Sequence, residues 1–134
     1  MTLPAQAEIV IIGGGAIGCS IAYHLAKLGK KDVLLLEKAQ LTHGATWHAA
    51  GLIGQMRSSR NLTRMMQYSA KLYTELEAET GQATGWHGVG SLRVAASNER
   101  WLELKRAATL AKSFGFPMEL VSPAEAAKLF PVMN

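Results

Sequence analysis

The sequence predicts an α/β fold that begins with a strand, a helix and a second strand parallel to the first. Three observations carry this prediction. Residues 8–12 are a short apolar run, residues 16–28 repeat apolar side chains at helical spacing, and residues 33–36 are a second apolar run. Short apolar runs on either side of an amphipathic helix are typical of neighbouring strands in a parallel sheet, which is buried on both faces.

The first helix is justified by apolar residues that recur on one of its faces: Ile17, Ile21, Leu25 and Leu28. Gly29 follows this face directly and is a natural end for the helix. Residues 38–56 have no regular period and are rich in Gly, Ala, Thr and His, which predicts a long loop. A strong helix is predicted over residues 60–79, and Gly81 ends it.

The last third of the chain predicts two short strands and two further helices. The strands are expected at residues 90–95 and 118–121 and the helices at residues 101–114 and 123–130. The final helix has the clearest start, because Ser122 and Glu125 form a capping-box pattern and Pro123 occupies the first helical position.

Composition narrows the classes of protein that fit. The 134 residues are 49% hydrophobic and 18% charged, as in a globular domain. The net charge of +4 comes from scattered basic residues, so no nucleic-acid surface is expected. No apolar run reaches the roughly 18 residues of a membrane span. The four histidines and Cys19 lack zinc-ligand spacing, so we expect no metal.

The location expected for the protein is cytoplasmic, or the mitochondrial matrix in a eukaryote. Cys19 is the single cysteine and cannot form an internal disulfide, which favours a reducing compartment. Only a few residues precede the first strand, so neither a signal peptide nor a transit peptide is expected.

The turn between the first strand and the first helix carries a dinucleotide-binding fingerprint. Gly13 permits the tight turn, Gly15 lets a pyrophosphate approach the backbone, and Gly18 lets the helix pack close to the strand. The helix then begins at Ala16 and Ile17, so its N–H groups and positive dipole end are directed at the phosphates.

An acidic residue completes the fingerprint. Glu37 closes the second apolar run, nineteen positions after Gly18. A carboxylate at this position accepts hydrogen bonds from both hydroxyls of an adenosine ribose and repels a 2′-phosphate. The sequence therefore predicts a Rossmann-like unit that binds FAD or NAD and not NADP.

The loop after Glu37 favours FAD over NAD. A classical NAD-binding half would proceed quickly to another strand and helix, whereas a long irregular segment can travel over the flavin end of FAD. Small residues and backbone amides in this loop suit packing on a flavin ring, and His48 adds a nucleophilic side chain. The run consists of Gly44, Ala45, Thr46, Trp47, His48, Ala49, Ala50, Gly51 and Leu52.

These motifs together resemble the N-terminus of the sarcosine and dimethylglycine dehydrogenases, which belong to the D-amino-acid-oxidase and glycine-oxidase class of flavoproteins. The resemblance rests on the fingerprint, the Glu37–Lys38 pair, the run at residues 44–52 and the segment at residues 85–93, and it covers essentially the whole chain. In that family the histidine of the Trp-His-Ala-Ala-Gly-Leu run is bonded covalently to the 8α-methyl group of FAD. The resemblance implies that His48 is this residue.

The resemblance also implies a domain organisation. Residues 1–84 would be the N-terminal portion of an FAD-binding domain, and residues 85–134 would be the start of a substrate domain. One strand–helix–strand unit is visible, and a parallel sheet needs more strands, so we expect an incomplete part of a two-domain flavoprotein. Most substrate-binding groups would lie beyond residue 134, so no catalytic residue is assigned.

The implied reaction is the oxidation of an N-methyl amine of the sarcosine or dimethylglycine type. A hydride equivalent passes to the flavin, and the iminium is hydrolysed to formaldehyde or gives its one-carbon unit to tetrahydrofolate, bound in a C-terminal part. An electron-transfer flavoprotein or a similar acceptor then takes the electrons.

Three alternatives remain open at this point. An amino-acid oxidase would hold FAD without a covalent bond and would use oxygen as the acceptor. A non-catalytic regulatory relative would keep the fold and could lose His48. A chain with an incomplete sheet could also fold poorly and bind nothing.

Overall fold

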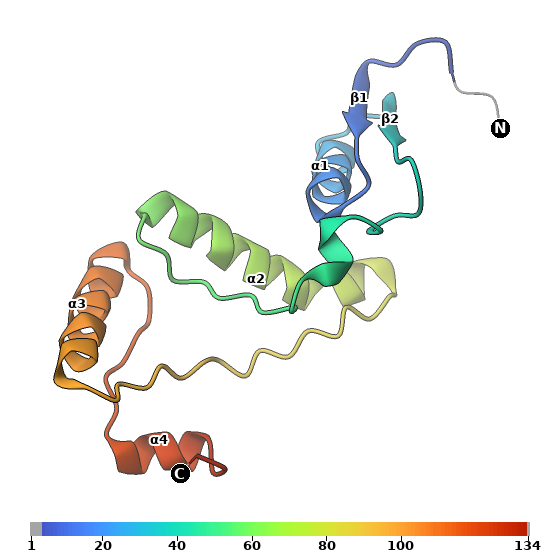
Figure 1. Ribbon diagram of the computed structural model, residues 1–134. Coiled ribbons are helices and arrows are strands. Elements are labelled where there is room, and N and C mark those ends of the chain that lie inside the picture. The colour runs from blue at the N-terminus through green and yellow to red at the C-terminus, as the bar shows by residue number, and fades with distance from the viewer. Residues whose placement is uncertain (1–3, 134) are drawn as a thin grey trace. The chain divides into compact units, whose positions relative to one another are not determined.

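The computed structural model describes residues 4–133, and the chain divides into two compact units, Met1–Leu52 and Ile53–Asn134. Within residues 4–133, the first unit holds two strands, one α-helix and one short 3₁₀ turn, and the second holds three α-helices. Figure 1 shows these elements with their labels. The elements are β1 (Ile9–Ile12), α1 (Ala16–Lys27), β2 (Val33–Leu36), η1 (Ala45–His48), α2 (Arg60–Thr80), α3 (Asn98–Phe114) and α4 (Pro123–Leu129).

The first unit is a βαβ unit, as predicted from its apolar periodicity. Strands β1 and β2 pair in parallel, with Ile9 opposite Val33 and Ile12 opposite Leu36. The N–H of Gly13 donates to the carbonyl oxygen of Leu36 at 2.8 Å and extends the ladder into the following turn. This register places the end of β1 and the end of β2 at the same edge of the sheet, where parallel strands hold their ligands.

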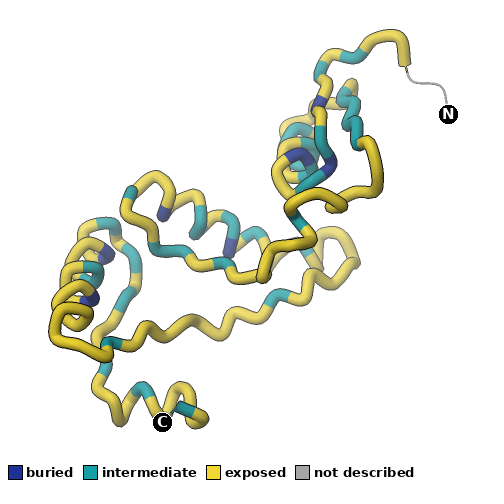
Figure 2. Tube along the Cα trace, in the orientation of Figure 1, coloured by how far each residue is buried: buried dark blue, intermediate teal, exposed yellow. Residues whose placement is uncertain are grey.

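The two-stranded sheet is part of a Rossmann-like sheet. Ile11 is 7% exposed, whereas Ile12 is 87% exposed and Ile17 on α1 is 78% exposed. Figure 2 shows that little of the first unit is buried. Large apolar side chains at this exposure are unusual for a parallel sheet, whose two faces are normally covered. The unit is therefore an incomplete portion of the fold, as the sequence predicts.

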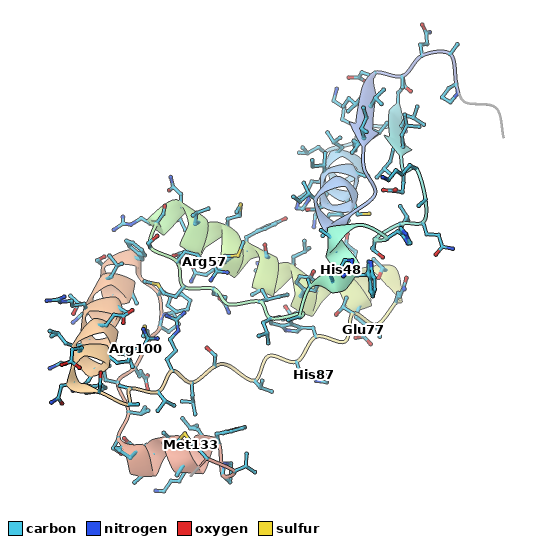
Figure 3. The ribbon with its side chains drawn as sticks, viewed as in Figure 1. His48, Arg57, Glu77, His87, Arg100 and Met133 are labelled. Atoms are coloured by element: carbon cyan, nitrogen blue, oxygen red, sulfur yellow. The ribbon has the colours of Figure 1, made fainter. Side chains whose placement is uncertain are left out.

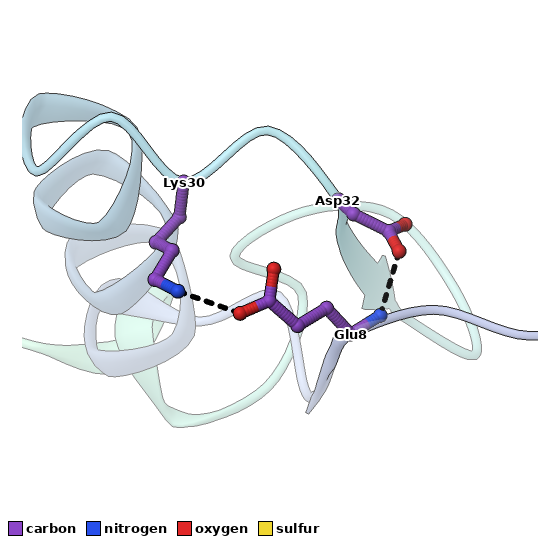
Figure 4. Close-up of polar contacts among 3 residues, drawn as sticks. All are labelled: Glu8, Lys30 and Asp32. Atoms are coloured by element: carbon purple, nitrogen blue, oxygen red, sulfur yellow. Dashed lines mark hydrogen bonds and ion pairs between the residues drawn. The ribbon is translucent and has the colours of Figure 1, made fainter.

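Polar contacts join the crossover to the start of β1. The ammonium of Lys30 lies 2.6 Å from Glu8 Oε1, and the N–H of Glu8 donates to Asp32 Oδ2 at 2.9 Å (Figure 4). About half of each charged side chain is exposed. This ion pair therefore contributes little to stability, about 0–1 kcal/mol at most. The hydrogen bond from the Glu8 N–H joins the residue before β1 to the residue before β2.

The second unit is organised around α2 and α3. Thr63 and Ala70 are buried on α2, and Leu104 and Ala111 are buried on α3. The Arg60 guanidinium at the start of α2 donates to the carbonyl oxygen of Ser113 at 2.5 Å and so reaches the end of α3.

The ends of these helices follow the sequence signals. Gly81 and Gly115 end α2 and α3 in the left-handed conformation, with φ of 72° and 71°, which glycine adopts without a steric penalty. Helix α3 begins three residues before the predicted start, because the Ser97 hydroxyl accepts a hydrogen bond from the N–H of Arg100 and caps it. The predicted capping box of Ser122 and Glu125 is present at α4.

Two strand predictions are wrong. Residues 90–95 and residues 118–121 form no strand in the part of the chain that the structure describes. A strand is held by hydrogen bonds to a neighbouring strand, and the pairing in residues 4–133 is confined to β1 and β2. Alternating apolar residues supply one face for packing but do not supply the partner.

Thr63 provides a test of the buried hydrogen bonds at the start of α2. Its buried hydroxyl donates to the carbonyl oxygen of Ser59 and accepts from the N–H of Arg57 at 3.1 Å. Thr63→Val keeps the shape but leaves the Arg57 N–H without this acceptor, so we expect a loss of about 1–3 kcal/mol in the free energy of unfolding. Urea denaturation measures it.

The control for this prediction is Thr74→Val on the same helix, where the side chain is exposed. The expected change there is within about 0.5 kcal/mol, as for most surface substitutions. Equal effects of the two substitutions would contradict the structural role of Thr63.

Candidate cofactor-binding site

The glycine-rich turn between β1 and α1 has the geometry that the fingerprint predicts for its first and last glycines. Gly13 has a φ of 109°, a conformation that residues with a side chain rarely adopt. A Cβ added at Gly18 would collide with the carbonyl oxygen of Gly13 and would lie 3.4 Å from a methyl group of Ile11. The helix therefore packs against the end of β1 as closely as it does because Gly18 lacks a side chain.

Helix α1 begins beside this turn and presents its N-terminus there. The N–H of Ala16 donates to the hydroxyl oxygen of Thr46 at 2.9 Å. The N–H groups of Ile17 and Gly18 follow in the first turn, where an α-helix provides no intrahelical acceptor. These donors and the positive end of the helix dipole suit an anionic group such as a pyrophosphate.

Glu37 lies at the end of β2, next to the glycine-rich turn. Its carboxylate accepts a hydrogen bond from the N–H of Gly14 at 2.7 Å and another from the N–H of Ala39 at 3.1 Å. The bond from Gly14, followed by the bond from Ala39, lowers the pKa of Glu37 below its usual value of 4.5. The carboxylate is therefore ionised at neutral pH and is oriented toward the turn.

The loop after Glu37 is tied to the turn at two places. The N–H of Thr42 donates to the carbonyl oxygen of Gly14 at 2.8 Å, and the hydroxyl of Thr46 accepts from Ala16 as described. Thr42 has a φ of 67°, which is uncommon for a β-branched residue and marks local strain. The strained residue is therefore the one through which the loop makes its first hydrogen bond to the glycine-rich turn.

His48 lies at the end of η1 on this loop (Figure 3). Its ring centroid is 4.0 Å from the ring centroid of Trp47, and the two ring planes are inclined by 37°. Both side chains are exposed, Trp47 by 65%. The imidazole is therefore accessible to a ligand that covers the loop, and the adjacent indole offers it an apolar surface.

The first unit contains every residue that the sequence predicts for cofactor binding. Hydrogen bonds and close packing join the fingerprint glycines, Ala16, Glu37 and Thr46 into one cluster. The remaining loop residues of the prediction lie exposed around or after it: Lys38, Gly44, Ala45, Ala49, Ala50, Gly51 and Leu52.

Sequence reasoning missed two residues that organise the cluster, Gly14 and Thr42. Gly14 uses both its N–H and its carbonyl in the hydrogen bonds above. Its signal was the run of three consecutive glycines, of which the fingerprint requires two. The positive φ of Thr42 has no signal in the sequence, since threonine disfavours that conformation.

Two other kinds of site are absent from residues 4–133. No group of three or more His, Cys, Asp or Glu side chains in this range is arranged to hold a metal ion. None of the helices in the same range has the length and apolar character needed to cross a bilayer.

The chain belongs to the FAD-dependent oxidoreductase family, whose model matches residues 8–134. Within this family it is similar to human mitochondrial sarcosine dehydrogenase, with 44% identity over 98% of the chain. It is 47% identical over 96% of its length to mitochondrial dimethylglycine dehydrogenase of Rattus norvegicus. The chain spans 14% and 15% of these two relatives.

Two further similarities bear on function and fold. The chain is 43% identical over its full length to the mitochondrial pyruvate dehydrogenase phosphatase regulatory subunit of Mus musculus, of which it spans 15%. The crystal structure of L-proline dehydrogenase from P. horikoshii matches with a TM-score of 0.82 and 30% identity, over 98% of this chain and 34% of that one. The Rossmann-like FAD-binding architecture predicted from the sequence is thereby confirmed.

The hydrogen bonds to Glu37 predict a dependence of stability on pH. A carboxylate whose pKa is lowered in the folded protein stabilises it above pH 4.5, and this contribution is lost as the pH falls through the lowered pKa. We expect Glu37→Gln to be less stable than the parent at neutral pH, with a difference that shrinks below pH 4.5.

Urea denaturation at a series of pH values from about 7 to about 3 checks this expectation. The control is Glu119→Gln, at an exposed glutamate of the second unit. A stability difference for Glu37→Gln that stays constant across the acidic range would show that the charge of Glu37 is not what stabilises the turn.

Proposed function

We propose that this chain is the cofactor-binding part of an FAD-dependent enzyme that oxidises an N-methyl amine of the sarcosine or dimethylglycine type. The observation that carries the proposal is the Glu37 carboxylate held beside the glycine-rich turn by the Gly14 N–H at 2.7 Å. This arrangement suits a ribose and a pyrophosphate in adjacent positions. The named activities of the relatives at 44% and 47% identity supply the substrate class.

The residues of the chain fit FAD in the following way. The missing side chain of Gly15 would let a pyrophosphate approach the backbone, and the N–H groups of Ile17 and Gly18, which follow Ala16 in the first turn of α1, would donate to it. Glu37 accepts hydrogen bonds from the ribose hydroxyls. Bound FAD would supply the hydride acceptor at its flavin ring. The loop at residues 44–52 would cover that ring and exclude water from it.

His48 is the proposed site of a covalent bond to the 8α-methyl group of the flavin. Support comes from its exposed imidazole at the end of η1 and from the adjacent Trp47 ring, 4.0 Å away between centroids. The turn that carries the pair is held to α1 through Thr46, which supports the proposal because it keeps this turn beside the glycine-rich turn. A tethered flavin would remain on the enzyme through every catalytic cycle.

The remaining parts of the proposal concern the whole enzyme. Residues 1–84 would belong to its FAD-binding domain and residues 85–134 to its substrate domain. Electrons would leave through an electron-transfer flavoprotein or a similar acceptor, and a C-terminal part would use tetrahydrofolate to take the one-carbon unit. In a eukaryote the protein would work in the mitochondrial matrix, since both dehydrogenase relatives are named as mitochondrial, and otherwise in the cytoplasm.

A regulatory role is the second candidate function. The relative named as a regulatory subunit is 43% identical over the full chain, which is close to the identity of the two dehydrogenases. Overall similarity therefore does not separate a catalytic protein from a regulatory one. An amino-acid oxidase with non-covalent FAD is the third candidate function, since the glycine oxidase of Geobacillus kaustophilus is 30% identical over 92% of the chain.

The experiment that separates these functions is the intact mass, under denaturing conditions, of the protein expressed from its complete reading frame, followed by peptide mapping. An FAD-sized increment on the peptide that contains His48 supports the proposed dehydrogenase. An unmodified mass with flavin released on denaturation supports the oxidase, and a protein without flavin supports the regulatory relative.

Replacement of His48 gives a sharper test of the attachment. We expect His48→Ala to abolish the covalent flavin while FAD still binds, because the contacts of Gly15 and Glu37 are untouched. In-gel flavin fluorescence after denaturation and the absorbance of the native protein measure the two properties. The control is His43→Ala, an exposed histidine of the same loop, which should keep the covalent flavin. Flavin that survives denaturation in His48→Ala would assign the attachment to another residue.

Replacement of Glu37 tests the ribose contact. In the His48→Ala background, where FAD can dissociate, we expect Glu37→Ala to weaken FAD binding by roughly 10- to 100-fold, the loss typical of a charged hydrogen bond. Fluorescence titration of the apoprotein measures the dissociation constant. An unchanged constant would remove Glu37 from the cofactor site.

A further inference from the structure

Gly14 is a glycine that the fingerprint does not require. It lies between Gly13 and Gly15, at a position that the pattern leaves open to other residues. Its backbone lies outside the left-handed region, so an L-residue could adopt its conformation. The residue is buried, and the reason for a glycine must lie in the space around it.

That space is filled by two residues of the segment that follows β2. A Cβ added at Gly14 would lie 2.5 Å from Cδ2 of Leu41 and 3.0 Å from Cβ of Glu37. The Leu41 methyl is at the end of a flexible side chain and can rotate away. The Cβ of Glu37 is attached to the backbone at the end of a paired strand, so it can move only if the end of β2 moves.

The hydrogen bonds of Gly14 act on the same segment. Its N–H donates to Glu37 Oε2 at 2.7 Å, and its carbonyl oxygen accepts from the N–H of Thr42 at 2.8 Å. The thiol of Cys19 on α1 is also within 3.4 Å of that carbonyl oxygen. The N–H and the carbonyl group of Gly14 therefore bind Glu37 and the start of the following loop, at Thr42, to the same residue of the glycine-rich turn.

We propose that Gly14 is a positioning residue for the Glu37 carboxylate, which it holds, through its N–H and its lack of a side chain, in the place where the adenosine ribose of FAD binds. The proposal rests on the proposed function, because it assumes that Glu37 contacts the ribose. It assigns a role to the open position of the fingerprint and predicts that alanine at this position, although small, shifts Glu37 and weakens the binding of FAD.

The test is a double-mutant cycle in the His48→Ala background of the protein made from the complete reading frame, with the dissociation constant of FAD as the readout. Gly14→Ala should weaken FAD by about 10-fold or more, since it displaces a charged hydrogen-bond acceptor. In a Glu37→Gln background the same substitution should have a much smaller effect, because the contact that it disturbs is already impaired. Equal effects in the two backgrounds would overturn the proposal.

Competition experiments add a readout that a general loss of structure would not produce. ADP contains the adenosine ribose and FMN does not. Gly14→Ala should therefore weaken the binding of ADP, measured by its competition with FAD, and should leave the competition of FMN with FAD unchanged. Equal weakening of both competitors would overturn the proposal. Gly88→Ala is the matched control, because an added Cβ there meets its nearest neighbour at an ordinary 3.5 Å.

A second variant covers the case in which Gly14→Ala does not fold. The double substitution Gly14→Ala with Leu41→Ala removes the tightest contact and keeps the contact with the Cβ of Glu37. It should still weaken FAD and ADP relative to Leu41→Ala alone, and no weakening would overturn the proposal. If Glu37→Gln by itself leaves FAD binding unchanged, the failure lies instead with the proposed ribose contact.

Discussion

The parallel pairing of β1 with β2 is the constraint on which the rest of the first unit depends. Because Ile12 is opposite Leu36 in the register, the residues that follow the two strands, Gly13 and Glu37, leave the sheet side by side. A shift of one residue would direct the side chain of Glu37 to the other face of the sheet. The position of the carboxylate beside the glycine-rich turn is therefore a consequence of strand register and requires no contact with a ligand.

The loop after β2 depends on this arrangement in turn. Its first hydrogen bond to the turn joins Thr42 to the carbonyl of Gly14, and its second joins Thr46 to the N-terminus of α1. At the first of these bonds the chain accepts an unfavourable backbone conformation at Thr42. The two bonds are polar and join residues that are far apart in the sequence, so they hold the loop to the turn although few apolar groups cover it. Rigid support of this kind is what a site needs when a mobile ligand must meet one particular side chain.

The parts of the structure that could be predicted are those fixed by neighbours in the sequence. The fingerprint glycines, the capping box of α4 and the period of α2 each answer a demand made within a few residues. The predictions of strands at residues 90–95 and 118–121 are wrong because strand pairing needs a partner strand from elsewhere in the chain. The same reasoning explains why Gly14 was missed, since its close neighbours Glu37 and Leu41 are more than twenty residues away in the sequence.

The exposure of apolar residues in the first unit has a practical consequence for anyone who handles this polypeptide. Ile12, Ile17 and Leu52 are each more than three-quarters exposed, and the sheet has two strands, both of them at an edge. Bare strand edges beside exposed apolar side chains recruit other chains and promote aggregation. A preparation restricted to the 134 residues of this chain is expected to aggregate as its concentration rises, so binding studies are best done on longer expression products.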